Sequence, residues 1–149
     1  MKGIILAGGK GTRLSPITDY MNKHLLPIFN KPMIYYPISL LILCGIKEIL
    51  IITNKKDIAS FKKLLNKFKK SPISFKFTVQ NKPNGIAEAF NISKKFIGKS
   101  EKNILILGDN FFYGQQLPAL IKNKLEKKRN HIFLYHVKNP YHFGNIEIK

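Results

Sequence analysis

The chain alternates between short apolar runs and longer stretches whose apolar residues recur at helical spacing. The predicted strands are residues 3–8, 48–53, 74–80, 103–108, 131–137 and 145–149. Residues 3–8 and 103–108 lack polar alternation, which predicts strands buried on both faces. Residues 74–80 alternate apolar and polar, as a strand exposed on one side does.

Helical patterns fill the intervals between these strands. Residues 32–45 are predicted to form a helix with Pro37 in or near its first turn and Gly45 at its end. Asp57 is predicted to cap a second helix, because apolar residues recur from residue 58 to 68 at the spacing of one helix face. Further helices are predicted for residues 86–97 and 117–125.

This alternation of strands and helices indicates the α/β class. It predicts a Rossmann-like, mainly parallel (mixed) sheet with helices on both faces. The length of 149 residues, with no internal repeat or linker, indicates a single domain over residues 1–149. In such folds ligands bind beyond the carboxyl ends of the strands, which directs attention to the loops at residues 8–13, 80–85 and 108–114.

Composition excludes several classes of protein. Cys44 is the only cysteine, so the chain forms no internal disulfide and no multi-cysteine zinc site, and a buried thiol is expected. The most apolar stretch, residues 32–46, is shorter than the roughly 20 residues of a membrane span. No secretory leader is recognised at the start of the chain, and a cytoplasmic location is expected.

The formal net charge of +18, from 26 Lys and Arg against 8 Asp and Glu, attracts polyanions. The lysines are spread along the chain, however, and are not interleaved with aromatic residues in a nucleic-acid-binding motif. Solvated lysine-rich faces are therefore favoured over specific nucleic-acid binding.

The first loop, "GGKGTR", is the clearest chemical signal. Gly8, Gly9 and Gly11 leave the backbone N–H groups open to a phosphate, and Arg13 adds a planar cationic fork. The phosphate-loop and dinucleotide patterns are both absent. From these residues alone, a phosphate cradle and an ordinary glycine turn both stay open.

Three later positions carry weaker signals. Asp109 ends a buried strand and is a candidate Mg²⁺ ligand, or else a turn or cap residue. Lys23 is either a solvated lysine or a phosphate contact. Gln80 offers both a donor and an acceptor, as the edge of a nucleobase requires, although an ordinary polar loop residue also fits.

Taken in order, these motifs resemble those of the sugar-nucleotide nucleotidyltransferases. The opening G-G-x-G-T-R-L of that family stands at residues 8–14, its K-Q-L-L-P stands as "KHLLP" at 23–27, and its K-P-M-I-Y-Y-P stands at 31–37. Residues 79–90, 107–114 and 135–148 resemble three further motifs of the family. The closest resemblance is to members that join dTTP and glucose 1-phosphate to give dTDP-glucose and pyrophosphate.

The resemblance implies a role for individual residues. Nucleotide binding is implied for Leu6, Gly8, Gly9, Gly11, Thr12, Arg13, Lys23, Gln80 and Gly85. It further implies a Mg²⁺ cofactor on Asp109, sugar contacts from Asn110 and Gly144, and catalysis by Arg13, Lys23 and Asp109. The implied partners are the small-molecule substrates, without a membrane or specific nucleic acid, in an assembly compatible with a homo-oligomer.

Two departures from the family pattern bear on function. His24 stands where the family has glutamine, and the family chain is about twice as long. The missing half carries a sugar-binding segment and a second metal-binding aspartate. The resemblance thus implies a truncated nucleotidyltransferase core. The alternatives are a non-catalytic nucleotide-binding protein, a UTP-using uridylyltransferase and, least favoured, a basic nucleic-acid-binding module.

Overall fold

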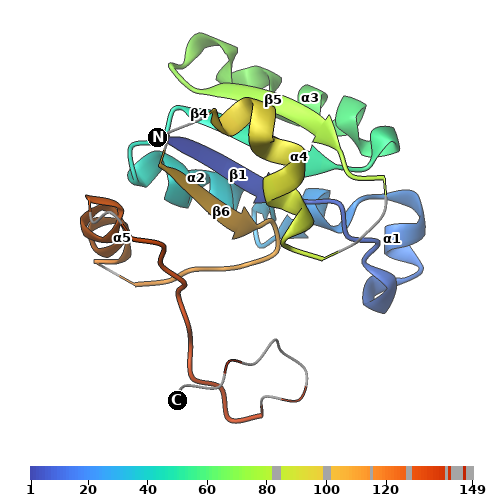
Figure 1. Cartoon of the computed structure of the whole chain (residues 1–149). Coiled ribbons are helices and arrows are strands. Elements are labelled where there is room, and N and C mark those ends of the chain that lie inside the picture. Colours follow the sequence, from blue (N-terminus) through green and yellow to red (C-terminus); the bar gives the residue numbers. More distant parts are fainter. Residues whose placement is uncertain are drawn as a thin grey trace.

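A computed structural model describes residues 1–81, 85–98, 102–114, 116–126, 129–139, 141 and 146. Its centre is a sheet of four parallel strands in the order β5-β4-β1-β6 (Figure 1). The strands are β1 (Lys2–Leu6), β4 (Glu48–Thr53), β5 (Ser74–Val79) and β6 (Asn103–Leu107). The predicted parallel sheet is confirmed.

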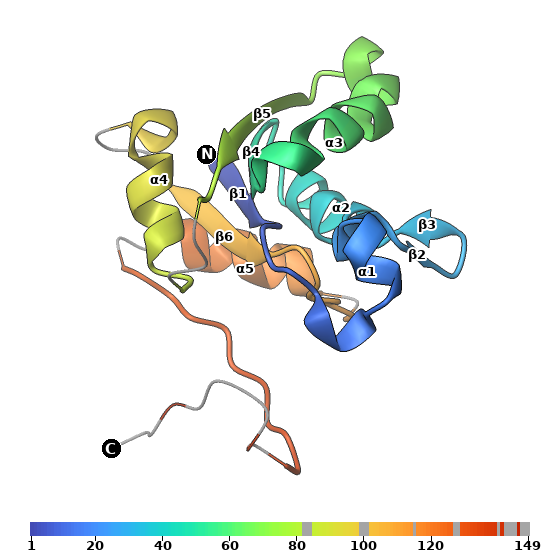
Figure 2. The same cartoon turned by 90° about the vertical axis from the view of Figure 1, so that its right-hand side faces the viewer.

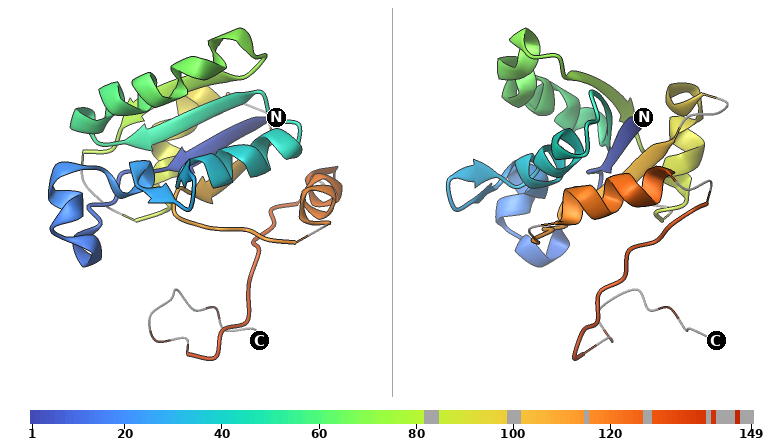
Figure 3. Two further views of the ribbon diagram at one scale, coloured as in Figure 1. Left: turned by 180° about the vertical axis from the view of Figure 1, so that it is seen from behind. Right: turned by 90° about the vertical axis from the view of Figure 1, so that its left-hand side faces the viewer.

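Strand β1 is apolar on both faces because both faces are covered. Ile5 belongs to a core cluster with α2 (Tyr35–Leu43) and α3 (Ile58–Leu65), whereas Ile4 packs with α4 (Glu88–Ile97). Both isoleucines are fully buried. Figures 1 and 3 show α2 and α3 on one side of the sheet and α4 on the other, as predicted.

Helix α2 ends where the sequence predicts. Gly45 has a φ of +83°, a left-handed conformation that suits glycine, and Pro37 lies in the first turn of the helix. Helix α5 (Leu117–Glu126) approaches the end of α2, where the Pro118 carbonyl oxygen lies 4.0 Å from Cys44 Sγ. Cys44 is fully buried, and this burial raises the pKa of its thiol.

Short elements follow β1 before α2 begins. They are the 3₁₀ turn η1 (Thr12–Leu14), α1 (Ile17–Tyr20), the 3₁₀ turn η2 (Lys23–Leu25), and the strands β2 (Pro27–Ile28) and β3 (Lys31–Pro32), which pair with each other antiparallel. The 3₁₀ turns η3 (Lys55–Asp57) and η4 (Asn66–Lys70) flank α3. In the described part of the chain, no helix has the length and apolarity to span a bilayer.

Two predicted strands differ from the structure. Strand β6 forms, but only Ile106 of its residues is buried, because β6 is the edge strand of the described sheet. Residues 131–137 do not form a strand, and Ile132 and Tyr135 are 76% and 90% exposed. Figure 2 shows this segment leading away from the sheet, so no described strand neighbours it. The strand predicted for 145–149 lies outside the described residues, apart from Ile146.

Asp57 stands at the position before α3, but its side chain does not cap the helix. Its carboxylate accepts hydrogen bonds from the side-chain amides of Asn22 and Asn54 instead, at 2.8 and 3.0 Å. The expected cap is therefore wrong, because a buried partner from the first loop region competes for the same carboxylate.

Candidate functional site

The parallel strands bring four carboxyl ends to one edge of the sheet. The chain leaves β1 into the glycine-rich loop, β4 into η3, β5 into Gln80 and β6 into the Gly108–Asp109 turn. This is the edge at which open α/β sheets bind ligands.

The loop after β1 requires glycine at two positions because other groups approach its backbone. A Cβ atom on Gly8 would lie 3.2 Å from Gln80 Oε1, and one on Gly11 would lie 3.0 Å from Thr18 Cγ2. Gly11 also has a φ of +67°. The Thr18 hydroxyl donates to the Gly11 carbonyl at 2.8 Å and holds the loop against α1.

Lys23 lies beneath this loop and forms an ion pair with Asp109. A Cβ atom on Gly9 would lie 3.7 Å from Lys23 Nζ, an ordinary contact distance. Burial by itself raises the pKa of Asp109, but the hydrogen bond and positive charge of Lys23 outweigh it and hold that pKa below 3.8. Asp109 is therefore ionised at neutral pH and already faces a cation.

The residues at the two ends of the glycine loop differ in burial. Leu6 is the last residue of β1 and is half-buried, and its carbonyl accepts the Gly108 N–H at 2.9 Å. Thr12 and Arg13 lie in η1, and both are exposed. The guanidinium of Arg13 thus stands at the surface of the loop, where a bound anion can reach it.

Gln80 is nearly buried at the end of β5, with 7% of its surface exposed. Its Nε2 donates to Glu88 at 2.7 Å. Because a carboxylate only accepts, this bond fixes the orientation of the amide and leaves Oε1 facing Gly8. Gly85 is exposed and has a φ of +91°, and among the described residues no atom beyond its chain neighbours lies within 4 Å of the position of a Cβ.

Only one of the two predicted sugar contacts lies among the described residues. Asn110 follows Asp109 directly and is half-buried, with its N–H donating to the Leu107 carbonyl at 3.2 Å. Gly144 lies outside the described residues.

A buried polar network behind the site was not predicted from the sequence. Asn22 Nδ2 donates to the Ala7 carbonyl at 3.1 Å and to Asp57, and Asn22 Oδ1 accepts the His24 N–H at 3.0 Å. His24 Nδ1 lies 2.7 Å from the same oxygen, so Nδ1 carries the proton. Asn22 belongs to no motif with a known mechanism, and nothing local in the sequence marks it.

His24 therefore does not stand open to solvent in place of the glutamine of the family. It is 2% exposed, and its ring packs against Gly108 at the start of the turn that carries Asp109. Burial, followed by the charge of Lys23, lowers the pKa of His24 from 6.5 to about 4. The ring is neutral at pH 7.

We expect Gly108→Ala to destabilise the fold by about 2 kcal/mol, the usual cost of overpacking a well-filled site. The added Cβ would lie 2.6 Å from His24 Cδ2 and 3.2 Å from the Leu6 carbonyl oxygen. Urea unfolding measures the loss. Gly9→Ala is the matched control, since in the described part of the chain the nearest atom to its Cβ beyond the neighbouring residues is Lys23 Cε at 3.6 Å. Equal stabilities of the two variants would contradict the prediction.

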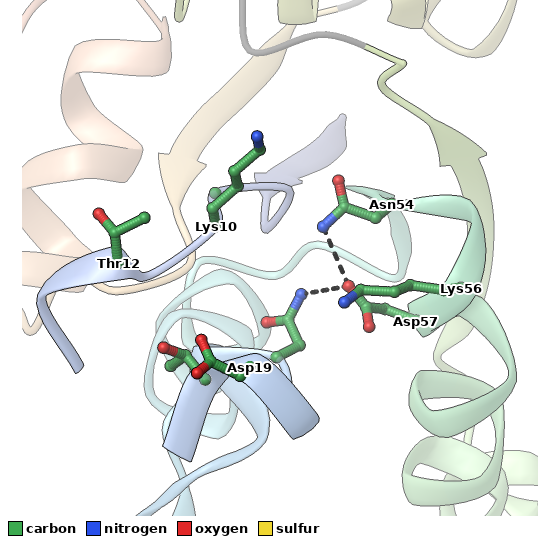
Figure 4. Close-up of a pocket in the computed structure, with 9 residues that line it drawn as sticks. Lys10, Thr12, Asp19, Asn54, Lys56 and Asp57 are labelled. Carbon is green, nitrogen blue, oxygen red and sulfur yellow. Dashed lines mark hydrogen bonds between the residues drawn. The ribbon is translucent and has the colours of Figure 1, made fainter. Parts of the chain in front are cut away.

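A pocket of about 420 Å³ opens beside the glycine loop (Figure 4). Its walls include Lys10 from the loop, Asp19 from α1, and Lys56 and Asp57 from η3. Its volume is within the range of small-molecule sites. The charges of the two lysines and two aspartates in its walls cancel, so the pocket lining favours neither an anionic nor a cationic ligand.

The described residues fit a magnesium ion only in part. None of the described residues form a group of three or more His, Cys, Asp and Glu that could hold a metal. Asp109 supplies one carboxylate, and Mg²⁺ in phosphate-transfer sites is commonly held by one or two carboxylates together with phosphates and water. The site thus suits an ion held largely by phosphate oxygens and does not suit one held by these residues alone.

The sequence profile of the family described as "Nucleotidyl transferase" matches residues 2–149. The chain belongs to this nucleotidyl transferase family. A protein of Neisseria meningitidis named glucose-1-phosphate thymidylyltransferase is 51% identical over 148 residues, which cover 99% of this chain and 51% of that protein. A protein of the same name from Mycolicibacterium smegmatis is 43% identical over 147 residues, with the same coverage.

Two solved structures agree with the fold. A Bacillus anthracis protein crystallised under the name glucose-1-phosphate thymidylyltransferase superimposes with a TM-score of 0.75 at 42% identity, covering 85% of this chain and 51% of the other. A UDP-glucose pyrophosphorylase superimposes with a TM-score of 0.67 at 24% identity, which supports the fold alone. The chain spans about half the length of the curated relatives it matches.

Proposed function

We propose that this chain carries the nucleotide-binding part of an enzyme that transfers a thymidylyl group from dTTP to glucose 1-phosphate, giving dTDP-glucose and pyrophosphate. The observation that carries the proposal is the meeting of the glycine loop, the Lys23–Asp109 pair and Gln80 at one edge of the sheet. The names and identities of the relatives supply the substrate class.

In this proposal the glycine loop and Arg13 bind the triphosphate. The small residues leave the loop backbone open to phosphate oxygens, and the exposed guanidinium of Arg13 adds a bidentate cationic contact. Gln80 Oε1 suits the N3–H donor that thymine and uracil share, because the Nε2 of the same amide is engaged by Glu88.

The reaction in this proposal is in-line attack by a phosphate oxygen of glucose 1-phosphate on the α-phosphorus of dTTP, with pyrophosphate leaving. Lys23 lies beneath the loop and neutralises developing negative charge, and Asn110 lies next to Asp109 on the side proposed for the sugar. A Mg²⁺ ion held by Asp109 and phosphate oxygens would supply further charge neutralisation. A cytoplasmic location belongs to the same proposal, because nucleoside triphosphates are cytoplasmic substrates.

One observation favours a second candidate, a nucleotide-binding protein without turnover. Among the described residues, no group of three or more His, Cys, Asp and Glu side chains that could hold a metal forms around Asp109. Such a chain would bind dTTP through the loop and Gln80 but release no pyrophosphate. A UTP-using enzyme is the other alternative, since Oε1 of Gln80 accepts equally well from uracil.

The decisive experiment incubates the purified chain with dTTP, glucose 1-phosphate and Mg²⁺ and measures both dTTP binding by calorimetry and pyrophosphate release. We expect Arg13→Ala to lower dTTP affinity by about tenfold to hundredfold, since hydrogen bonds to charged groups contribute about 1.5–3 kcal/mol. Arg129→Ala, at an exposed arginine outside the site, is the matched control and should leave the affinity unchanged.

Each outcome separates the candidates. Binding that depends on Arg13 without pyrophosphate release supports the non-catalytic alternative. Tighter binding of UTP than of dTTP supports the uridylyltransferase. If neither nucleotide binds, the proposed function is overturned.

A further inference from the structure

Lys23 and Asp109 were predicted to serve different ligands, a phosphate and a metal ion, yet the structure pairs them with each other. We propose that Lys23 is an exchangeable counter-ion. It pairs with the carboxylate of Asp109 while the site holds no nucleotide, and it moves to the phosphates of the nucleotide when the nucleotide binds. A divalent cation then reaches Asp109 together with the nucleotide and not before it. This inference rests on the proposed function.

The geometry allows Lys23 to change partners without movement of the backbone. Its Nζ lies close to Gly9, 3.7 Å from the position of a Cβ, so the ammonium stands between the glycine loop and Asp109. An ammonium has three donors on a flexible stem, and the structure shows one of them directed to Asp109. A phosphate placed on the loop would lie within reach of the same group.

The charge balance gives the exchange its direction. In the nucleotide-free site the ammonium and the carboxylate neutralise each other, and the described residues supply no cluster of metal ligands around them. A divalent cation approaching Asp109 would meet the repulsion of Lys23 at close range, in a partly buried setting where water screens charges less than it does at the open surface. Phosphate charges remove this repulsion because they attract both cations at once.

The proposal predicts opposite effects of one substitution on two ligands. We expect Lys23→Met to raise the affinity of the nucleotide-free chain for Mn²⁺, a paramagnetic substitute for Mg²⁺, by about tenfold or more. The same variant should bind dTTP in EDTA about tenfold more weakly. The free Mn²⁺ signal in electron paramagnetic resonance measures the first effect, and calorimetry measures the second.

Two further variants locate the effect. Lys47→Met removes the same charge from an exposed position just before β4, at the edge of the sheet opposite the site. It should leave the Mn²⁺ affinity within twofold of that of the parent chain. Adding Asp109→Asn to Lys23→Met should abolish the gain. Circular dichroism confirms that each variant is folded, and Lys23→Gln takes the place of Lys23→Met if the latter does not fold.

Unchanged or weaker Mn²⁺ binding in Lys23→Met overturns the counter-ion role, as does a gain that survives Asp109→Asn. The Mn²⁺ titrations need no nucleotide and no turnover. Failure of the parent chain to bind dTTP instead overturns the proposed function, so the two failures are distinguishable.

Discussion

Replacing Asn22 with leucine will lower the free energy of unfolding by about 3 kcal/mol, because each buried polar group left without a partner costs about 1–3 kcal/mol. Asn22 is 7% exposed, and its amide joins the end of β1 to η3 and to His24. Leucine fills a similar volume but accepts nothing from the N–H and Nδ1–H of His24. It also removes one of the two amide donors to the buried carboxylate of Asp57.

Urea unfolding followed by circular dichroism checks this loss. Asn54→Leu is the matched control, because Asn54 is only half-buried and donates one amide hydrogen bond to the same carboxylate. We expect it to cost about 1 kcal/mol, the usual net value of one hydrogen bond. Losses of equal size in the two variants would show that the bonds of Asn22 to Ala7 and His24 add no stability.

The sheet and helix α2 could be predicted because their determinants are local. Ile4 and Ile5 point to opposite faces of β1, and both faces are covered. The unbroken apolar run therefore predicted correctly that the strand is buried on both faces. Gly45 ends α2 by adopting a left-handed conformation that few other residues tolerate. Such signals are read from a few neighbouring residues.

The errors occur where a structure depends on distant partners. Residues 131–137 have the composition of a strand, but a strand needs a neighbour, and the described sheet ends at β6. Burial of β6 was overestimated for the same reason, since one of its edges has no described strand beside it. Composition predicts the propensity of a segment and not the presence of its partner.

For the candidate site too, single residues could be predicted from the sequence, but the contacts between them could not. The glycine loop and Asp109 were singled out because each directly follows a predicted strand and each residue type suits a nucleotide site. The nucleotide roles expected for Lys23 and Gln80 came from the resemblance to the family. The contacts that arrange them could not be identified, since Asn22 meets Asp57 only after the ends of β1 and β4 come together. His24 was singled out as a departure from the family, but its packing against Gly108 depends on β6.

Acidification will destabilise the fold through His24. Burial and the neighbouring charge of Lys23 lower its pKa from 6.5 to about 4, against the opposing charges of Asp109 and Asp57. The unfolded chain takes up this proton near pH 6.5 and the folded chain does so only near pH 4. Between these values the unfolded state binds more protons, so the stabilisation is complete above pH 6.5 and is lost as the pH falls towards 4.

The expected loss from this one group is about 3 kcal/mol, since each pKa unit corresponds to about 1.4 kcal/mol. Because His24 is 2% exposed, solvent screening does not reduce this value appreciably. Urea unfolding in EDTA across this pH range measures how steeply the free energy of unfolding falls as the pH is lowered. His24→Gln should make this dependence flatter. His131→Gln, the control at an exposed histidine, should leave it unchanged. The pKa of Asp109 lies below 3.8, so its own contribution is lost only at lower pH and does not imitate the effect. If His24→Gln kept the pH dependence of the parent chain, the acid sensitivity would arise from other groups. The neutral, buried imidazole behind Asp109 would then not be a source of stability.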